Sequence, residues 1–371
     1  MWGRLTPSHA SRKLPRDMSA ARKPRLLTGD RPTGPLHLGH LVGTLQSRVE
    51  LQDSHECFLI VADLHSLTTR SKREQITELP ARVRDIVLDL LSVGIDPERS
   101  TIYLQSGVPA VYDLAILLQM LTPVERLSRL GTIKDMARSA GLADAEVPMG
   151  LLGYPVLQAA DILMANAELV PVGGDNETHV HVARELAEHF NEAYGRVFAV
   201  PQPTISSTPA LPGVHTIPAG SAHKMSKSLG NTINLKDPPE EVARKLRTLP
   251  GPAPGEPGLP PLFAYAEAFL PAEAQDLRAD YDRGVIGFAA VQERIITAIE
   301  AALAPIRERR AHFAADRGRV EEILVDGTIT ARKVAYETLA RVREAMGLEP
   351  LWAGLVDATR ARAEARKKPV Y

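Results

Sequence analysis

Two short motifs carry residue types that are suited to handling phosphate groups. The first, His37-Leu38-Gly39-His40, follows a Gly/Pro turn and opens a stretch with helical periodicity. The N-terminus of a helix offers free backbone N–H groups and a positive dipole end, which favour phosphate. Two imidazoles one helical turn apart can donate hydrogen bonds to phosphate oxygens that gain charge during transfer. Gly39 has no Cβ, so a flat ring can approach the backbone there.

The second motif is Lys224-Met225-Ser226-Lys227-Ser228, which lies between Gly220 and Gly230. Two lysines among small hydroxyl residues predict a mobile cationic loop that closes on the β- and γ-phosphates of ATP. Either motif alone is explained as well by a polar turn or a solvated loop. Their occurrence together and in this order predicts a nucleotide site.

A third segment indicates a pocket for an organic substrate. Asp161 lies inside the apolar stretch Tyr154–Leu163, where a buried acid needs a partner. A ligand group that only donates hydrogen bonds, such as an indole N–H, would satisfy it, and so would a nearby backbone N–H. Asp175, after two glycines at the end of an expected strand, is well placed to accept hydrogen bonds from ribose hydroxyls.

The elements around these motifs predict an α/β fold. Apolar strands are expected at residues 26–27, 57–62 and 101–105, with helices at 38–51 and 80–93 between them. This alternation is typical of a Rossmann-like, doubly wound parallel sheet. Beyond the Pro/Gly-rich segment 250–261 only helical patterns follow, at 289–306 and 331–346. We therefore expect a disordered basic extension (1–24), a catalytic α/β domain (25–235) and an all-helical C-terminal domain (236–371).

Composition excludes several other classes of protein. The chain has 371 residues, a formal net charge of −1 and one cysteine, Cys57. One cysteine rules out disulfides and cysteine-built metal sites within the chain, and we expect no metal site built by the protein alone. No apolar run is long enough to cross a membrane, and a near-neutral chain is a poor indiscriminate nucleic-acid binder. A cytoplasmic location is expected.

Several segments resemble the tryptophanyl-tRNA synthetases, a family of class I aminoacyl-tRNA synthetases. The resemblance runs from about Leu26 to Leu348 and includes both phosphate motifs and the stretch around Asp161. It also includes a set of shorter segments: Arg31–Gly34, Val61–His65, Gln105-Ser106, Val170–Gly173, Arg184–Ala187 and Arg332–Leu348. The resemblance implies ATP-dependent activation of L-tryptophan and its transfer to tRNA(Trp). It also implies a homodimer, Mg²⁺ that arrives with ATP, and a helical domain that reads the anticodon.

The resemblance also implies roles for individual residues. The catalytic residues are His37, His40, Lys224 and Lys227. ATP is held by Arg31, Pro32, Thr33, Gly39, His40, Gly173, Gly174, Asp175, Lys224, Met225, Ser226, Lys227 and Ser228. Tryptophan contacts Asp161, Tyr154, Gln158, His65 and Asn176, and Lys134 contacts phosphate. Two basic clusters, Arg244–Arg247 and Arg307–Arg310, are candidates for contacts with tRNA phosphates or for solvated helix faces.

Three positions depart from the pattern usual in this family, namely Arg31, Gln158 and Asn176. They bear on amino-acid discrimination and leave a divergent, non-charging copy as an alternative. Gln158 and Gly173-Gly174-Asp175 also resemble a tyrosyl-tRNA synthetase, whereas Val170-Pro171-Val172 and the C-terminal helix favour tryptophan. A small-molecule adenylyltransferase shares the histidine motif but needs no helical domain.

Overall fold

The computed structural model describes residues 22–173, 177–205, 210–214, 224–249, 251 and 261–367. Within these residues five strands form one parallel sheet in the order β3-β2-β1-β4-β5. Their bounds are β1 Arg25–Asp30, β2 Glu56–Val61, β3 Ser100–Leu104, β4 Leu169–Val172 and β5 Gln202–Ile205. The strands expected from the sequence are thereby confirmed as β1, β2 and β3.

The helices of the sheet-forming part lie between successive strands, except η5, which follows β5. They are α1 Leu38–His40, the π-helix η1 Leu41–Leu45, α2 Gln46–Leu51, α3 Asp63–Leu67, α4 Arg73–Thr77, α5 Leu79–Val93, η2 Gln105–Gly107, α6 Ala110–Gln119, α7 Val124–Ser128, α8 Gly131–Ser139, η3 Asp144–Glu146, α9 Met149–Met164, α10 Glu177–Tyr194 and η5 Lys227–Leu229. The C-terminal helices are α11 Pro239–Arg247, α12 Leu262–Phe269, α13 Ala274–Asp282, α14 Phe288–Ala315, α15 Arg317–Ala345 and α16 Leu348–Lys367.

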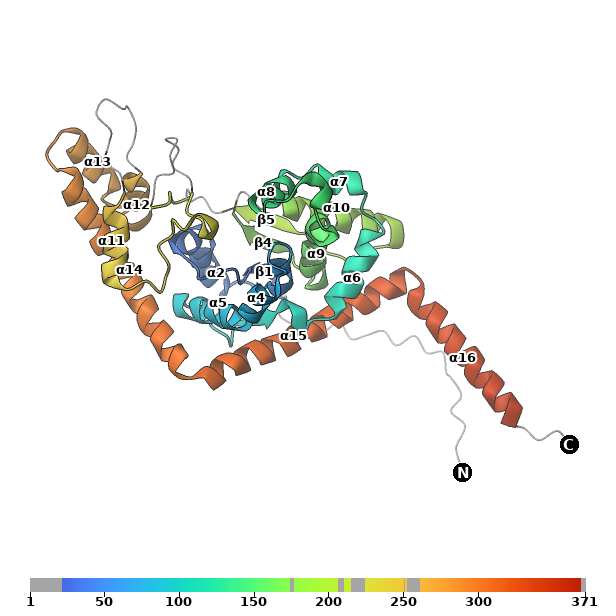
Figure 1. The fold of residues 1–371 in the computed structure, drawn as a ribbon. Helices are drawn as coiled ribbons and strands as arrows, with labels where there is room; N and C mark the ends of the chain where they lie inside the picture. The colour runs from blue at the N-terminus through green and yellow to red at the C-terminus, as the bar shows by residue number, and fades with distance from the viewer. Residues whose placement is uncertain are drawn as a thin grey trace.

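The strand order places a topological switch point between β1 and β4. The chain builds the sheet outward from β1 to β3 and then returns to the other side of β1 to add β4 and β5 (Figure 1). In open parallel sheets, ligands bind beyond the carboxyl ends of the strands at such a point. This arrangement confirms the Rossmann-like, doubly wound α/β fold followed by helices.

The core lies on both faces of the sheet because a parallel sheet is covered on both sides. In β2 the alternation is clear: Leu59 and Val61 belong to one buried cluster, and Phe58 and Ile60 belong to the other. The first cluster continues into α11, α12 and α14, so the C-terminal helices share a core with the sheet rather than building a separate one.

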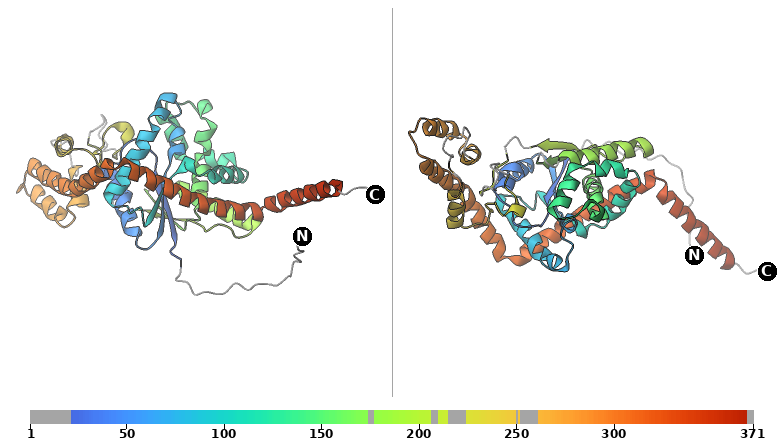
Figure 2. Two further views of the ribbon diagram at one scale, coloured as in Figure 1. Left: turned by 90° about the horizontal axis from the view of Figure 1, so that it is seen from below. Right: turned by 45° about the horizontal axis from the view of Figure 1, so that its top comes forward.

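Helix α15 covers the edge of the sheet at β3, as two further views show (Figure 2). Thr328 Oγ1 accepts a hydrogen bond of 3.1 Å from the backbone N–H of Leu104, an edge-strand group that would otherwise need water. The helix can come this close because residue 327 is glycine: a Cβ there would lie 1.9 Å from the carbonyl oxygen of Ile102. The first half of α15 adds to one core cluster and its second half to the other.

Helix α16 leaves the body and points away from it (Figure 1). Most of the extension expected to be disordered lies outside the described residues. Its last members, Arg22 and Lys23, contact the body through Glu168 and the carbonyl oxygen of Asp53. In the part of the chain that the structure describes, no helix is long and apolar enough to cross a membrane.

The two basic clusters form contacts within the chain. Arg244 and Lys245 bind Glu241, Lys245 also binds Asp237, and Arg247 binds Glu293. The side chains of Arg307, Arg309 and Arg310 likewise bind groups of the chain itself. The structure therefore does not support these clusters as free cationic surfaces for tRNA. The sequence alone does not reveal most of these contacts, because the partner carboxylates and carbonyl groups are mostly far away along the chain.

Candidate active site

The histidine motif begins its helix at the carboxyl edge of the sheet. The backbone N–H of His37 donates to Nδ1 of His40 at 3.2 Å, and the two rings lie 3.8 Å apart between centroids. The helix continues through η1, a π-helical segment of a kind often found at functional sites. The helix expected at residues 38–51 is thus confirmed, with an irregularity that its periodicity did not indicate.

Both imidazoles are held neutral. Burial, together with His40 and Lys227, lowers the pKa of His37 to about 2. Burial lowers the pKa of His40 to about 4, although Asp30 acts in the opposite direction. Because Nδ1 of His40 accepts a hydrogen bond, its proton lies on Nε2, where it can be donated to a ligand. A Cβ on Gly39 would lie 3.1 Å from the His37 ring, so the glycine keeps this ring in place.

Asp30, the last residue of β1, is the main counter-charge of the motif. Its carboxylate receives a hydrogen bond of 2.5 Å from Arg48 of α2. Burial raises the pKa of Asp30, but Arg48, His40 and Lys227 together outweigh this effect and hold the pKa below its ordinary value. An ionised Asp30 therefore lies among the cationic groups of the two motifs.

The lysine loop is fastened to the histidine motif by short backbone pairings. The backbone N–H of Leu38 donates to the carbonyl oxygen of Ile233 at 2.9 Å, and that of Leu235 donates to Leu36 at 3.0 Å. We call these paired segments, Leu36–Leu38 and Ile233–Leu235, the motif junction. The motif junction therefore fixes the start of the helix and the segment after the lysine loop relative to each other.

Within the loop, residues that look alike in the sequence have different surroundings. The Met225 side chain is buried in the core, and its N–H donates to Leu211. The N–H of Ser226 donates to Oδ1 of Asn231 at 2.7 Å. Lys224 is exposed, whereas the ammonium group of Lys227 lies 2.8 Å from the carbonyl oxygen of Gly34. The two lysines therefore flank Met225 and Ser226, whose backbone is held by hydrogen bonds.

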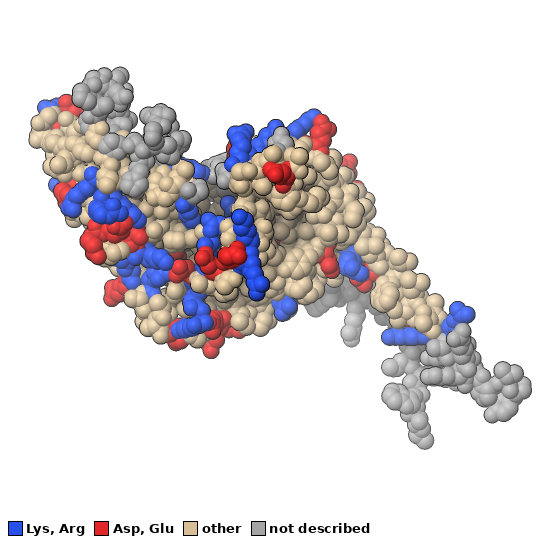
Figure 3. Space-filling model, viewed as in Figure 1, with Lys and Arg blue, Asp and Glu red and all other residues tan. Residues whose placement is uncertain are grey.

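Lys227 belongs to a cationic group that spans several elements. Burial lowers its pKa to about 8; Asp30 and Asp89 raise it, and the nearby guanidinium groups of Arg31 and Arg70 lower it. In the space-filling view, lysine and arginine side chains gather around the hollowed centre of this face, with acidic side chains among them (Figure 3). Several cations around one open region suit a polyphosphate.

The second part of the site is centred on Asp161 of α9. This side chain is 2 % exposed, and its Oδ2 accepts hydrogen bonds from Gln105 Nε2 at 2.7 Å and from His65 Nε2 at 3.0 Å. Its Oδ1 is buried and has no hydrogen-bond partner among the described residues. Burial raises the pKa of Asp161, while His65 and Gln105 act against this rise. A buried carboxylate oxygen without a donor suits a ligand that supplies one.

Two strands and one helix bring these groups together. His65 belongs to α3, which follows β2, and Gln105 begins η2 directly after β3. On α9, Tyr154, Gln158 and Asp161 lie within one face, because positions four and seven residues apart coincide on a helix. The Tyr154 hydroxyl forms hydrogen bonds with Thr132 and His179, at 3.2 and 2.8 Å.

The structure brings several of the residues named from the sequence into two groups. His37, His40 and Lys227 interact electrostatically in the first, and Asp161 and His65 are in direct contact in the second. Lys134 is exposed on α8 and forms no contact that supports a role. Gly174, Asp175, Asn176 and the side chain of Ser228 lie outside the described residues.

Some residues at the site were not assigned a role from the sequence. Gln105 was noted only as part of a family-like pair, yet its amide bonds both Asp161 and the backbone of Leu64. Arg70 also belongs to the cationic group, and Asp30 is the acid that faces it. Arg70 follows β2 and α3, and Asp30 ends β1. Such positions meet at the carboxyl edge of the sheet, and this was the signal that could have indicated a role at the site.

Comparisons with known proteins agree with this arrangement. The family model described as "tRNA synthetases class I (W and Y)" matches residues 18–304. The tryptophan–tRNA ligase of Treponema pallidum is 48% identical over 333 residues, which cover 87% of this chain and 97% of that protein. The tryptophan–tRNA ligase of Borreliella burgdorferi is 40% identical over 345 residues, covering 89% and 95%.

The fold of this chain is also similar to solved structures of such synthetases. The Campylobacter jejuni tryptophanyl-tRNA synthetase complexed with ADP and tryptophan matches with a TM-score of 0.73 at 30% identity, covering 87% of this chain and all of that one. The Archaeoglobus fulgidus tyrosyl-tRNA synthetase complexed with L-tyrosine matches with a TM-score of 0.61 at 25% identity, covering 78% and 90%. The chain belongs to the family of class I tRNA synthetases for tryptophan and tyrosine.

Proposed function

We propose that this chain is a tryptophan–tRNA ligase, which uses ATP to activate L-tryptophan and transfers it to tRNA(Trp). The observation that carries the proposal is the buried Oδ1 of Asp161, which has no donor among the described residues, while Oδ2 is bound by His65 and Gln105 beyond the carboxyl ends of β2 and β3. An indole N–H supplies the missing donor. A phenol hydroxyl can also donate, so the preference for tryptophan over tyrosine rests on the relatives at 48% and 40% identity.

The cationic group provides the chemistry proposed for the first step. The tryptophan carboxylate attacks the α-phosphorus of ATP, a bond forms between them, and pyrophosphate leaves. No protein nucleophile is needed, so the protein contributes positioning and charge stabilisation. Neutral His37 and His40 donate hydrogen bonds, while Lys224 and Lys227 with Arg31 balance the charge of the phosphates. In the second step a hydroxyl at the 3′ end of the tRNA attacks the adenylate carbonyl carbon and AMP leaves.

Mg²⁺ is proposed to accompany ATP. Among the described residues no group of three or more histidine, cysteine, aspartate or glutamate side chains could hold a metal ion together. Mg²⁺ commonly keeps several waters and binds through substrate phosphates. When bound, the ion would neutralise part of the phosphate charge that the lysines face.

A homodimer and a cytoplasmic location complete the proposal. Exposed apolar side chains follow one face of α6, with Tyr112, Ile116 and Met120 39%, 52% and 74% exposed. A row of exposed apolar side chains of this kind supports a protein–protein contact. Sedimentation equilibrium of the purified chain tests the dimer, and a mass of one chain at micromolar concentration would contradict it.

The function is tested by charging of tRNA. Transcripts of tRNA(Trp) and tRNA(Tyr) are incubated with ATP, Mg²⁺ and radiolabelled tryptophan or tyrosine. We expect label only on tRNA(Trp) and only from tryptophan. Label from tyrosine on tRNA(Tyr) would replace the proposal by a tyrosine enzyme. Amino-acid-dependent release of pyrophosphate without charging of either tRNA would indicate a non-charging copy.

A further inference from the structure

Three arginines of helix α14 form hydrogen bonds with earlier parts of the chain. Arg307 donates to the carbonyl oxygen of Asp237 at 3.1 Å, and Arg309 donates to that of Ser92 at 2.6 Å. Arg310 differs from both because its contacts are with carboxylates of α5: its Nε lies 2.9 Å from Asp89 Oδ1 and its Nη2 lies 2.7 Å from Asp85 Oδ1.

Asp89 connects Arg310 to the histidine motif. The side chain is fully buried, and its second oxygen, Oδ2, accepts the backbone N–H of Leu36 at 2.9 Å. Leu36 immediately precedes His37 and belongs to the motif junction. A carboxylate without access to water depends on its partners, so the loss of one partner leaves a charge that the others cannot balance. For Asp89, Arg310 is the cationic partner, and the backbone N–H of Leu36 is the partner next to the histidine motif.

A second path leads from Arg310 to the segment that follows the lysine loop. Asp85 accepts hydrogen bonds from Arg310 and from Lys236, whose ammonium group lies 2.9 Å from Asp85 Oδ2. Asp89 also acts on the loop itself, since its charge is one of the two that favour the protonated form of Lys227.

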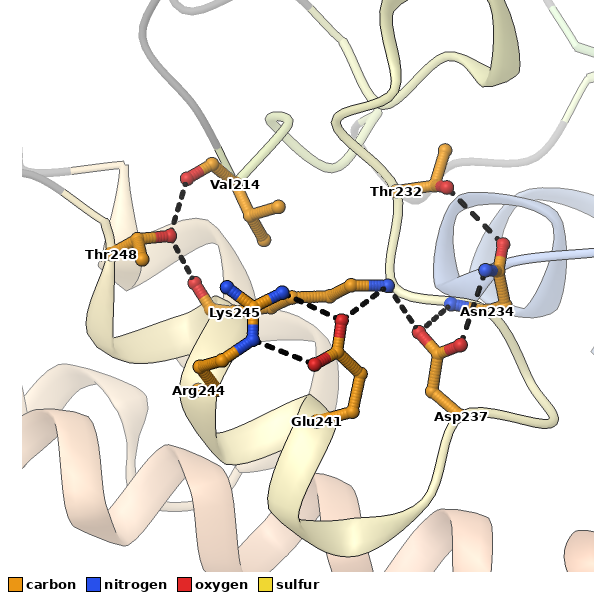
Figure 4. Close-up of polar contacts among 8 residues, drawn as sticks. All are labelled: Val214, Thr232, Asn234, Asp237, Glu241, Arg244, Lys245 and Thr248. Carbon is orange, nitrogen blue, oxygen red and sulfur yellow. Dashed lines mark hydrogen bonds and ion pairs between the residues drawn. The ribbon is translucent and has the colours of Figure 1, made fainter.

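The chain next to Lys236 is fixed by a separate polar cluster (Figure 4). Asp237 accepts the backbone N–H of Asn234 at 2.8 Å and the ammonium group of Lys245 at 2.6 Å. Asn234 faces His37 across the motif junction. Arg307 holds the carbonyl oxygen of the same Asp237. Helix α14 thus holds the junction from the side of Leu36 through Arg310 and from the side of Asn234 through Arg307.

We propose that Arg310 is a positioning residue for adenylate formation, which acts through Asp89 to hold Leu36 and thereby the histidine motif against the lysine loop. This role rests on the proposed function. It makes a residue of the C-terminal helices part of the support of the ATP site, although the guanidinium group itself touches no substrate. A displacement of α14 therefore moves the motif junction with it.

The competing explanation is that Arg310 merely docks α14 on α5. The chain contains a matched control for it, because Arg309 is the preceding residue of the same helix and binds Ser92 of the same α5. Arg309 contacts a backbone carbonyl and does not contact Asp89. The variants Arg310→Met and Arg309→Met each remove a docking contact, and only the first one releases Asp89.

The experiment measures ATP–pyrophosphate exchange with tryptophan for the full-length wild type, Arg310→Met, Arg309→Met and Arg310→Lys, together with thermal melts. For Arg310→Met we expect kcat to fall about tenfold to a hundredfold, since a misplacement of about 1 Å has effects of this size. The KM for tryptophan should change less than about threefold, because the Asp161 pocket is not part of the network. Arg309→Met should lose Tm to a similar degree and retain kcat within about threefold.

Arg310→Lys keeps a positive charge beside Asp89 but loses the paired donation from Nε to Asp89 and from Nη2 to Asp85, so we expect its kcat to fall severalfold, less than in Arg310→Met. If Arg310→Met does not fold, this variant carries the test: a kcat reduced severalfold at a near-normal Tm supports the positioning role, and a normal kcat overturns it. Equal losses of kcat in Arg310→Met and Arg309→Met at equal loss of Tm would also overturn it. A wild type without tryptophan-dependent exchange would refute the proposed function and this role together. An active wild type with an unaffected Arg310→Met would refute the role alone.

Discussion

Replacing Asp161 by asparagine changes the charge and the hydrogen-bonding pattern of the substrate pocket but almost nothing of its volume. In the wild type, Oδ2 receives hydrogen bonds from His65 and Gln105, and Oδ1 is left without a donor. In Asp161→Asn the amide oxygen takes the place of Oδ2, because both neighbours donate. The amide NH₂ then occupies the place of Oδ1 and opposes the indole N–H, so two donors face each other.

The expected magnitude follows from the contact that is lost. A hydrogen bond to a charged group contributes about 1.5–3 kcal/mol, and each 1.4 kcal/mol corresponds to about tenfold in kcat/KM. The variant should therefore lose about tenfold to a hundredfold or more in kcat/KM for tryptophan, with the opposed donors adding to the loss. The KM for ATP should stay nearly constant, because ATP contacts are assigned to the other group of residues.

The assay is pyrophosphate exchange with L-tryptophan and with β-(3-benzothienyl)-L-alanine, an isostere in which sulfur replaces the indole N–H. The wild type should prefer tryptophan, and Asp161→Asn should lose most of this preference, because a site built to accept one hydrogen bond rejects ligands that lack the donor.

Thermal melts separate this role from a structural one. Burial raises the pKa of Asp161, so the folded state favours the protonated carboxyl group and pays for ionisation as pH rises. A neutral asparagine removes this cost, and we expect the Tm at pH 7 to stay level or rise. A variant with a lower Tm and an unchanged preference for tryptophan over the isostere would refute the assignment of Asp161 to the indole.

Lys227→Ala should lower kcat for exchange about tenfold to a thousandfold with little change in tryptophan affinity, because one preorganised charge is lost; single-turnover kinetics check this. Because burial lowers the pKa of Lys227 to about 8, its charge is present below that pH and is lost above it. The kcat/KM for ATP should therefore decline as pH rises through about 8, whereas His37 and His40, with pKa values of about 2 and about 4, should produce no change between pH 5 and 7. Gly327→Ala should lower the free energy of unfolding by about 1–3 kcal/mol or more in denaturant melts, because its Cβ would meet the backbone of β3; Gly354→Ala, with open space around it, should not.

The elements with a clear period were predictable from the sequence. The apolar run in β2 and the helical spacing in α5 determine those elements locally, and their alternation determines the fold class. The close contact of α15 with β3 was not predictable, because it depends on Gly327 lying opposite Ile102, more than two hundred residues away. Likewise, nothing local indicates that Arg310 binds Asp85 and Asp89 rather than solvent.

The site was predictable where its residues form a motif. His37, His40 and Lys227 follow a known spacing, and Asp161 is conspicuous as an acid in an apolar helix. Gln105 has no such pattern, and its role appears only once β3 places it against Asp161. The long separation between contributing segments is thus what limits prediction of the supporting residues.

The most direct test of tryptophan activation is ATP–pyrophosphate exchange by the purified full-length chain with each of the twenty amino acids in turn. We expect exchange with tryptophan and, for the other nineteen, rates at least about a hundredfold lower, as a buried polar contact discriminates by such factors. Exchange supported by tyrosine, or by no amino acid at all, would contradict the central claim that Asp161 and the two phosphate motifs form a tryptophan-activating site.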